Sequence, residues 1–164
     1  MRIRDFAGLL LLLRCSQPAK PQQRLLVGPA DTHAHVKQPS PSIGLDLAGR
    51  MVIRSDSAWR KLWSQLQGDL DSSKYSTPSV DFHREILVIA AEGTFSGDIS
   101  SVHVDSILQH GADLEVVVRS VRPWGIACMG GQMLTAPVDI VRVPKHSGKV
   151  LFVERRSRYP FCRE

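Results

Sequence analysis

The chain has 164 residues, 43% of them hydrophobic, which fits one globular domain with an additional terminal segment and a core that needs no disulfides. Its formal net charge is +5, and without residues 1–14, which hold three arginines and one aspartate, the net charge falls to +3. So small an excess, without a basic stripe that carries aromatic residues, argues against nucleic acid as a partner.

The N-terminus has the pattern of an export signal. Basic residues in Met1–Asp5 precede the apolar run Phe6–Leu13, which is far too short to cross a bilayer as a helix. The alternative is an N-terminal helix buried in the fold. We expect residues 1–15 to be a signal peptide or lipoprotein leader, and the protein to be exported to the periplasm, to the cell surface or to a membrane as an anchored lipoprotein.

The three cysteines fall into two groups, Cys15 near the N-terminus and the pair Cys128 and Cys162. Cys15 directly follows the apolar run, where a bacterial lipoprotein carries its lipidated cysteine, although Arg14 replaces the small residue usual before it. Lipidation of Cys15 therefore stays open. We expect Cys128 and Cys162 to form a disulfide in an oxidising compartment, with two free thiols as the alternative. No CxxC or Cys/His cluster indicates structural zinc, and we predict neither a metal site nor a cofactor.

Residues 16–43 are rich in Pro, Gln and Ser, which predicts a tether with little regular structure. Within it, Arg24–Val27 has the composition of a short strand at the edge of the domain. His33 and His35 stand two residues apart and would face the same way in a strand, an arrangement that can chelate a metal. Because no third ligand is near them in the sequence, we favour two solvated histidines.

Residues 45–53 have the pattern of an extended segment with a turn near Gly49, and a helix follows. Ser55 or Asp56 can cap its first turn, and Gly68 closes it. The next apolar residues fall at i, i+3, i+4 and i+7 on one face: Trp59, Leu62, Trp63 and Leu66. Two tryptophans on one helix can also form a ligand platform, but such a stripe more often packs into a core.

The apolar run Ile86–Ala91 predicts a strand buried on both faces, around which the other elements are arranged. Alternating or β-branched segments downstream predict further strands, with Val102 and Val104 pointing inward and a turn at 110–113. These strands are expected at 99–106, 114–119, 137–143 and 149–153, followed by a basic tail at 155–158. We predict an α+β, β-dominated fold: one amphipathic helix on a mostly antiparallel sheet of about six strands, curled into a sandwich or open barrel.

Four segments, in order, resemble the PrcB C-terminal domain family of bacterial envelope and secreted proteins. They are the two-tryptophan helix Ser57–Trp63, the strand entry Val80–Val88, the glycine-containing turn Gly93–Gly97 and the strand Leu134–Pro144. The resemblance covers about Ile53 to Phe152, and we assign residues 44–164 to this domain. It implies a non-enzymatic accessory or binding module, in some cases beside a protease. The turn departs from the family pattern, because Phe95–Asp98 lacks the Pro-Thr-Gly-Gly-Tyr sequence.

No sequence motif compels a reaction. There is no G-x-S-x-G nucleophile turn, no phosphate loop and no dinucleotide fingerprint. A Cys128 nucleophile with His103 or His110 is conceivable, but the expected disulfide with Cys162 argues against it. A small hydrolase or a metal-binding protein is therefore the weaker alternative.

We predict that the protein binds another envelope or secreted protein, such as a protease, through the loops Thr94–Asp98 and Arg122–Gly131. Glycine-rich turns and the Arg122–Trp124 loop on a β scaffold also resemble the chagasin-type cysteine-protease inhibitors, so a loop-based inhibitor is the alternative. The candidate partner-binding residues are aromatic and charged loop residues and their neighbours. They are Phe95, Ser96, Gly97, Arg122, Trp124 and Met129.

Overall fold

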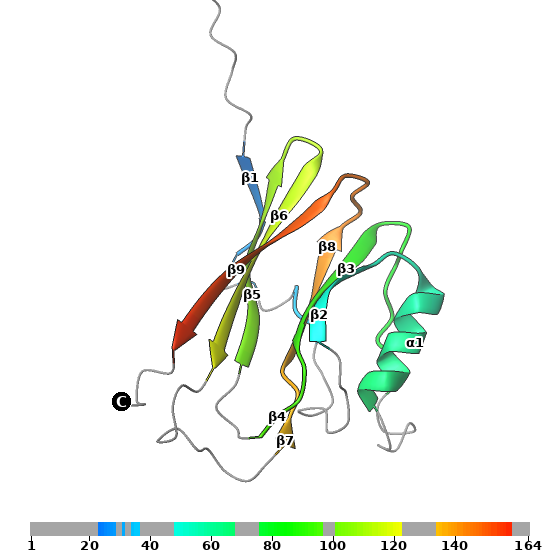
Figure 1. The fold of residues 1–164 in the computed structure, drawn as a ribbon. Helices are drawn as coiled ribbons and strands as arrows, with labels where there is room; N and C mark the ends of the chain where they lie inside the picture. The colour runs from blue at the N-terminus through cyan, green and yellow to red at the C-terminus, as the bar shows by residue number, and fades with distance from the viewer. Residues whose placement is uncertain are drawn as a thin grey trace, which may run out of the picture.

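The computed structural model describes residues 23–28, 31, 34–36, 48–67, 76–96, 101–122 and 134–158, with backbone alone at Ser96, Arg122 and Arg158. These residues form one helix, two facing sheets and a short strand pair (Figure 1). The elements are β1 Gln23–Val27, β2 Ala48–Ile53, α1 Asp56–Gln67, β3 Glu85–Glu92, β4 Phe95–Ser96, β5 Ser101–His110, β6 Asp113–Arg122, β7 Leu134–Thr135, β8 Val138–Pro144 and β9 Val150–Arg158.

The larger sheet, sheet A, has the strand order β1-β5-β6-β9, and the smaller sheet, sheet B, has the order β2-β3-β8. Every pairing within these two sheets is antiparallel except that of β6 with β9. The predicted β-dominated fold with one helix on a mostly antiparallel sheet is confirmed, in its open sandwich form. The described residues give seven strands in the two sheets rather than about six, because β1 and β2 both join them.

Strand β3 forms the centre of the molecule and separates two layers of apolar side chains. Val88 and Ala90 point towards sheet A and pack with residues of β5 and β6. Leu87 and Ile89 point the other way and pack under α1. The prediction that this apolar run is buried on both faces is therefore confirmed, and it explains why β3 shows no alternation of polar and apolar residues.

Helix α1 covers the outer face of sheet B (Figure 1). Ser55 Oγ accepts a hydrogen bond from the Ala58 amide at 3.4 Å, so Ser55 caps the first turn, as predicted. The four residues of the predicted stripe are all buried. Trp59 Nε1 donates to the Pro78 carbonyl at 2.9 Å, which satisfies the polar atom of a fully buried ring. The tryptophans therefore belong to the core and do not form a ligand platform.

Sheet A contains the hairpin of β5 and β6, which turns at Gly111 with φ of 61°. Val102 and Val104 point into the core, as predicted. A bulge interrupts the β5–β6 register between Val104 and Ser106, so the side-chain alternation shifts by one position along β5.

The short strand predicted at Arg24–Val27 is confirmed. It is β1, which pairs with β5 at the edge of sheet A. Further along the same Pro/Gln/Ser-rich range, Val36 donates from its amide to the Ile140 carbonyl of β8 at 2.8 Å, so both segments pack on the sheets. The expected basic tail 155–158 continues β9, because β6 is long enough to pair with all nine residues of that strand.

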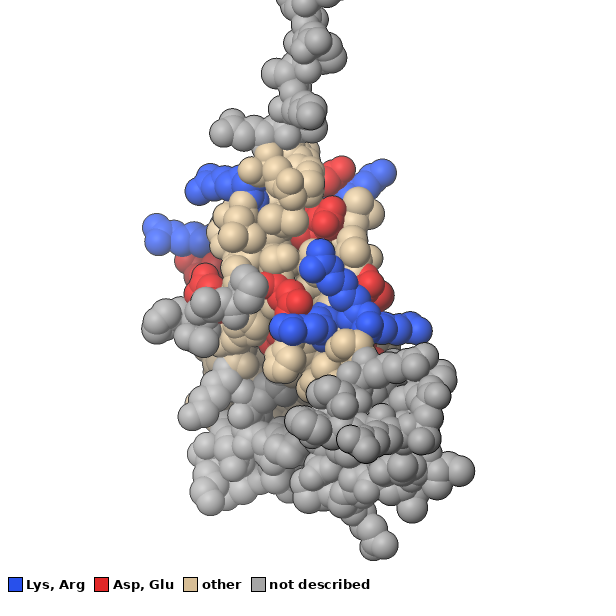
Figure 2. Space-filling view, turned by 90° about the vertical axis from the view of Figure 1, so that its left-hand side faces the viewer, with Lys and Arg blue, Asp and Glu red and all other residues tan. Residues whose placement is uncertain are grey.

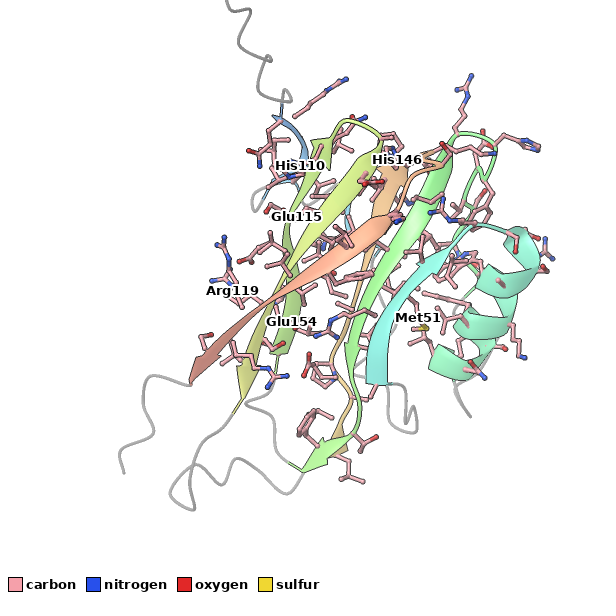
Figure 3. The ribbon with its side chains drawn as sticks, turned by 45° about the horizontal axis from the view of Figure 1, so that its top comes forward. Met51, His110, Glu115, Arg119, His146 and Glu154 are labelled. Carbon is pink, nitrogen blue, oxygen red and sulfur yellow. The ribbon has the colours of Figure 1, made fainter. Side chains whose placement is uncertain are left out.

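Three segments meet at the end of the molecule that carries the β5–β6 turn, where Figure 3 labels His146. His146 Nε2 hydrogen-bonds to the Ala112 carbonyl, and Arg54 donates to the carbonyl of His146. Gly148 packs so closely on this turn that a Cβ atom there would lie 1.4 Å from the Ala112 oxygen. A side chain at position 148 would therefore push the two segments apart.

Candidate functional site

Strands β4 and β7 pair two residues of the first predicted partner-binding loop with two residues that follow the second loop in the sequence. Phe95 pairs with Thr135 and Ser96 with Leu134, so the chain after β4 and the chain before β7 leave from neighbouring positions. Strand β6, whose last residue is Arg122, ends towards the same end of the molecule, at the bottom of Figure 1. We call this part, made of β4 and β7, the β4–β7 end. Gly97, Trp124 and Met129 lie outside the described residues.

The β4–β7 end extends the β3–β8 ladder beyond the core. Gly93, between β3 and β4, is buried and has φ of 80°, a conformation that favours glycine. A Cβ atom at Gly93 would also lie 3.3 Å from the Ala48 Cβ of the neighbouring strand β2. The glycine therefore allows the chain to bend out of sheet B into β4.

The side chains of this end differ in exposure. Phe95 is half-buried and makes contacts, so it is not the fully exposed anchor that its loop position indicates. Leu134 is 54% exposed, although it stands directly opposite Ser96 in the strand pair. Leu134 was not among the predicted partner-binding residues. The sequence carries little signal for it, since a leucine at the start of a strand usually points into a core.

The buried polar side chains of the described residues gather towards the same end. They are Glu92, Ser120, Thr135 and Asp139, each at most 8% exposed. Two of them carry carboxylates between the sheets, where charge is costly unless it is paired and hydrogen-bonded. The carboxylates of Glu92 and Asp139 have separate sets of partners.

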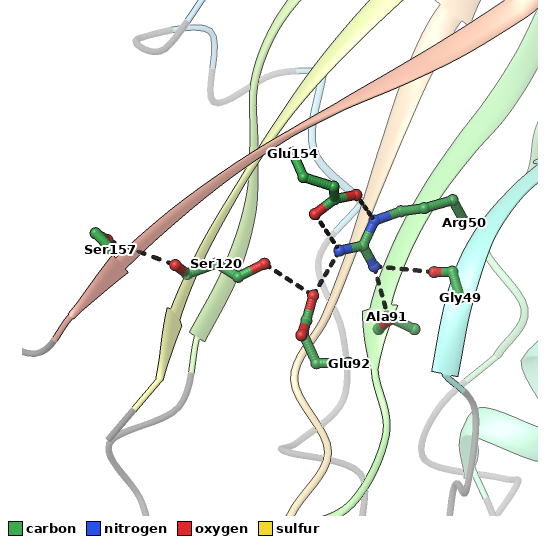
Figure 4. A network of polar contacts seen from close by, with 7 residues as sticks. All are labelled: Gly49, Arg50, Ala91, Glu92, Ser120, Glu154 and Ser157. Atoms are coloured by element: carbon green, nitrogen blue, oxygen red, sulfur yellow. Dashed lines mark hydrogen bonds and ion pairs between the residues drawn. The ribbon is translucent and has the colours of Figure 1, made fainter. Parts of the chain in front are cut away.

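Arg50 on β2 is the centre of the first set, the Arg50 cluster, with Glu92, Ser120 and Glu154 (Figure 4). Its guanidinium donates to the two carboxylate oxygens of Glu154 at 2.7 and 2.9 Å. It also donates to Glu92 Oε1 at 2.5 Å and to the Ala91 carbonyl at 2.7 Å. Ser120 Oγ donates to the same Glu92 oxygen at 2.8 Å. The cluster therefore joins the edge strand β2 of sheet B to the edge strand β9 of sheet A.

The hydrogen bond with Glu154 raises the pKa of Arg50, partial burial lowers it, and the bond with Glu92 raises it again, so that the net change is upward. The guanidinium therefore stays charged, with bidentate geometry towards Glu154. Arg50 faces two carboxylates, and the contacts of Glu92 with Arg50 and Ser120 join sheet B to sheet A. These contacts favour a structural role.

Asp139 on β8 is the centre of the second set, the Asp139 cluster. Its Oδ1 lies 2.8 Å from His35 Nδ1, and its Oδ2 accepts a hydrogen bond from the Val104 amide at 2.7 Å. Val104 adjoins the β5 bulge, and the carboxylate of Asp139 satisfies its buried amide. The cluster joins β8 to β5 on the opposite side of the sandwich from β9. The prediction that His35 is solvated is wrong, because His35 is bonded to Asp139 and its side chain is 27% exposed. His33 lies outside the described residues.

The histidines considered as partners of Cys128 lie on sheet A. His103 is exposed, and His110 Nε2 lies 3.4 Å from Glu115 Oε2, an ion-pair distance without hydrogen-bond geometry. Figure 3 shows His110, Glu115 and Arg119 on sheet A, away from Met51, which lies between β2 and α1. Cys15, Cys128 and Cys162 all lie outside the described residues, as does the export signal.

Comparison of the chain with family models, with curated proteins and with solved structures finds no match. Among the described residues, no group of three or more His, Cys, Asp or Glu side chains is placed to hold a metal ion. No helix within the described ranges has the length and apolar character needed to cross a membrane.

Proposed function

We propose that the chain is an exported, non-enzymatic protein-binding module, which acts as an accessory subunit of a cell-envelope or secreted protease. The observation that carries this proposal is the β4–β7 end, where Phe95 and Ser96 of one candidate loop pair with β7 and Leu134 is 54% exposed. Leu134 shares its face of the strand pair with Ser96, and a large apolar side chain exposed on a projecting strand pair is a candidate anchor for a partner protein. The PrcB-like segments supply the expectation of a protease.

The test is capture of envelope and secreted proteins from the source cells, with the full chain as bait. We expect capture of a protease, and a loss of roughly tenfold or more in affinity for the Leu134→Arg variant. Leu25→Arg is the matched control, because Leu25 is 57% exposed but lies on β1, in sheet A. Equal capture by the Leu134→Arg variant would remove the β4–β7 end from the proposal.

A loop-based protease inhibitor is the second candidate function, favoured by the same projecting end. An activity assay separates the two: an accessory subunit leaves the captured protease active, whereas an inhibitor abolishes cleavage and competes with substrate. A hydrolase or metal protein is the weaker alternative. The paired state of the Glu92 and Asp139 carboxylates supports a structural role for both.

Export has its own measurement, the intact mass of the protein isolated from its cells. Cleavage after the apolar run would remove the leader, and a diacylglyceryl mass on Cys15 would support a membrane anchor. Loss of two protons from Cys128 and Cys162 would support the disulfide. An intact N-terminus with free thiols would contradict the proposed export.

A further inference from the structure

Strand β9 leaves one long edge open. It pairs with β6 over nine consecutive residues in parallel register, from Val150 opposite Leu114 to Arg158 opposite Arg122, with no bulge. β9 is also the last strand in the order of sheet A. Within the described ranges, no strand and no backbone hydrogen bond occupies its second edge. Such an edge presents unpaired amides and carbonyls to any extended segment that approaches it.

The other edge strands are shorter or already occupied. β1 has five residues and a bulge in its pairing with β5, and β2 has six residues and includes Gly49 with φ of 142°. β8 is covered by residues 34–36, because Val36 donates to Ile140 and Arg142 donates to the Ala34 carbonyl. Of the four edges, β9 is therefore the one that is long, regular and open among the described residues.

The free charge of this edge is basic. Lys149, Arg155 and Arg156 lie on or beside β9 and are exposed. The one acidic residue of the strand, Glu154, has both carboxylate oxygens bonded to Arg50. Arginines on an edge repel a second copy of the same strand, and the same charge attracts an acidic segment.

The outer face of sheet A adds an apolar part to this edge. Leu151 and Val153 are 57% and 39% exposed, and Arg155 follows them on the same side of the strand, at alternate positions. Figure 2 looks onto the side of the molecule that sheet A occupies and shows uncharged side chains running between basic and acidic ones. A strand added beside β9 would place its own alternate side chains next to these three residues.

We propose that the open edge of β9 binds an extended, acidic segment of a partner protein, which adds to sheet A as a further strand. Its apolar residues lie beside Leu151 and Val153, and its acidic residues lie beside Arg155. This inference rests on the proposed function as a protein-binding module, but it uses a surface distinct from the β4–β7 end. Backbone hydrogen bonds supply the affinity, and the order of apolar and acidic residues supplies the specificity.

The probe is the synthetic peptide Glu-Thr-Glu-Thr-Val-Thr-Val-Thr, ordered to run antiparallel to β9, with binding to the full chain followed by fluorescence anisotropy. We expect binding that weakens when Lys replaces Glu in the peptide. Arg155→Glu should weaken binding of the acidic peptide by roughly tenfold and strengthen binding of the lysine peptide, because each change exchanges an attractive cross-strand pair for a repulsive one. Arg60→Glu is the control, since Arg60 is exposed on α1.

Backbone pairing is tested with two N-methylated peptides. One peptide carries methyl groups on its odd-numbered amides and the other on its even-numbered amides, so each lacks the hydrogen-bond donors of one edge. Because β9 pairs with a single edge of the peptide, one methylated peptide should lose binding and the other should keep it. Equal binding of the two methylated peptides, or binding that is unchanged by Arg155→Glu, would overturn strand addition. Self-association of the chain that Arg155→Glu abolishes would overturn the acidic partner in favour of a second copy.

The two proposals fail separately. Loss of peptide binding with capture still dependent on Leu134 would overturn the β9 site alone. Peptide binding without Leu134-dependent capture would overturn the β4–β7 end alone. Circular dichroism of each variant shows whether it is folded, and the exposed positions of Leu134 and Arg155 predict that it is.

Discussion

Sheet B is covered by α1 on its outer face, whereas no described helix covers the outer face of sheet A. The difference is visible in the sequences of the strands. β3 is apolar without interruption because both of its faces are buried, while Leu151 and Val153 of β9 alternate with inward-facing neighbours and are exposed. Sheet B thus forms the packed base of the domain, and sheet A carries the exposed apolar side chains of Leu151 and Val153. The predictions that follow test this division.

The largest effect is expected under the helix. Trp59→Ala removes a fully buried ring between α1 and sheet B, and the cavity should cost about 3–5 kcal/mol of unfolding free energy. Urea unfolding followed by circular dichroism measures this loss. A loss below about 1 kcal/mol would mean that α1 contributes little to the packing of sheet B.

The junction between the sheets comes second. Arg50→Gln removes the ion pair between Arg50 and Glu92, whose side chain is 3% exposed, and the ion pair between Arg50 and Glu154 as well. We expect a loss of about 2–3 kcal/mol, below the value for a fully buried pair because Glu154 is 34% exposed. The double variant with Glu92→Gln should recover part of the loss. No recovery would argue that the cost arises from packing of the arginine chain and not from the unpaired carboxylate.

Gly148→Ala tests the contact between the β5–β6 turn and the segment that leads into β9. The added methyl carbon would lie 1.4 Å from the Ala112 carbonyl oxygen, so backbone must move, at a cost of about 1–3 kcal/mol. Thermal unfolding measures the change. Ser147→Ala, an exposed neighbour, is the control and should unfold as the parent does. An unfolding temperature of Gly148→Ala equal to that of the parent would show that the backbone at this contact moves without strain.

The smallest effect is expected on the open face. Leu151→Thr keeps the β preference of the position, exchanges a 57% exposed side chain, and should change the unfolding free energy by no more than about 0.5 kcal/mol. A destabilisation above about 1 kcal/mol that depends on protein concentration would show that another molecule covers sheet A. That result would remove the contrast between the two outer faces.

The elements with local signals could be predicted from the sequence. The stripe from Trp59 to Leu66 defines α1, the apolar run in β3 defines the central strand, and the glycine at 111 marks the hairpin turn. What could not be predicted is how the strands divide between two sheets. All strands after β3 are compatible with pairing to it, and only β8 does so downstream, because pairing depends on register and long-range packing.

The polar clusters carry no local signal at all. Arg50 stands 42 residues from Glu92 and 104 residues from Glu154 in the sequence. The local sequence around each of these three residues predicts only an exposed charge. Glu92 completes an apolar run and gave no indication of a buried charge. Leu134 could not be identified either, because its exposure follows from the bend at Gly93 that carries β4 beyond the core.

The parallel neighbour of β6 reaches it only after the chain has passed through β7 and β8 of other sheets. Leu114 of β6 pairs with Val150 of β9, which is distant in the sequence, whereas β5 and β6 are joined by a tight turn. We therefore expect the hairpin to fold early and β9 to add last, a sequence of events that pulse-labelled amide exchange would reveal as late protection of β6 and β9. During synthesis the chain cannot complete sheet A until residue 158 has left the ribosome, so the strand that closes this sheet is also the last described strand to be made.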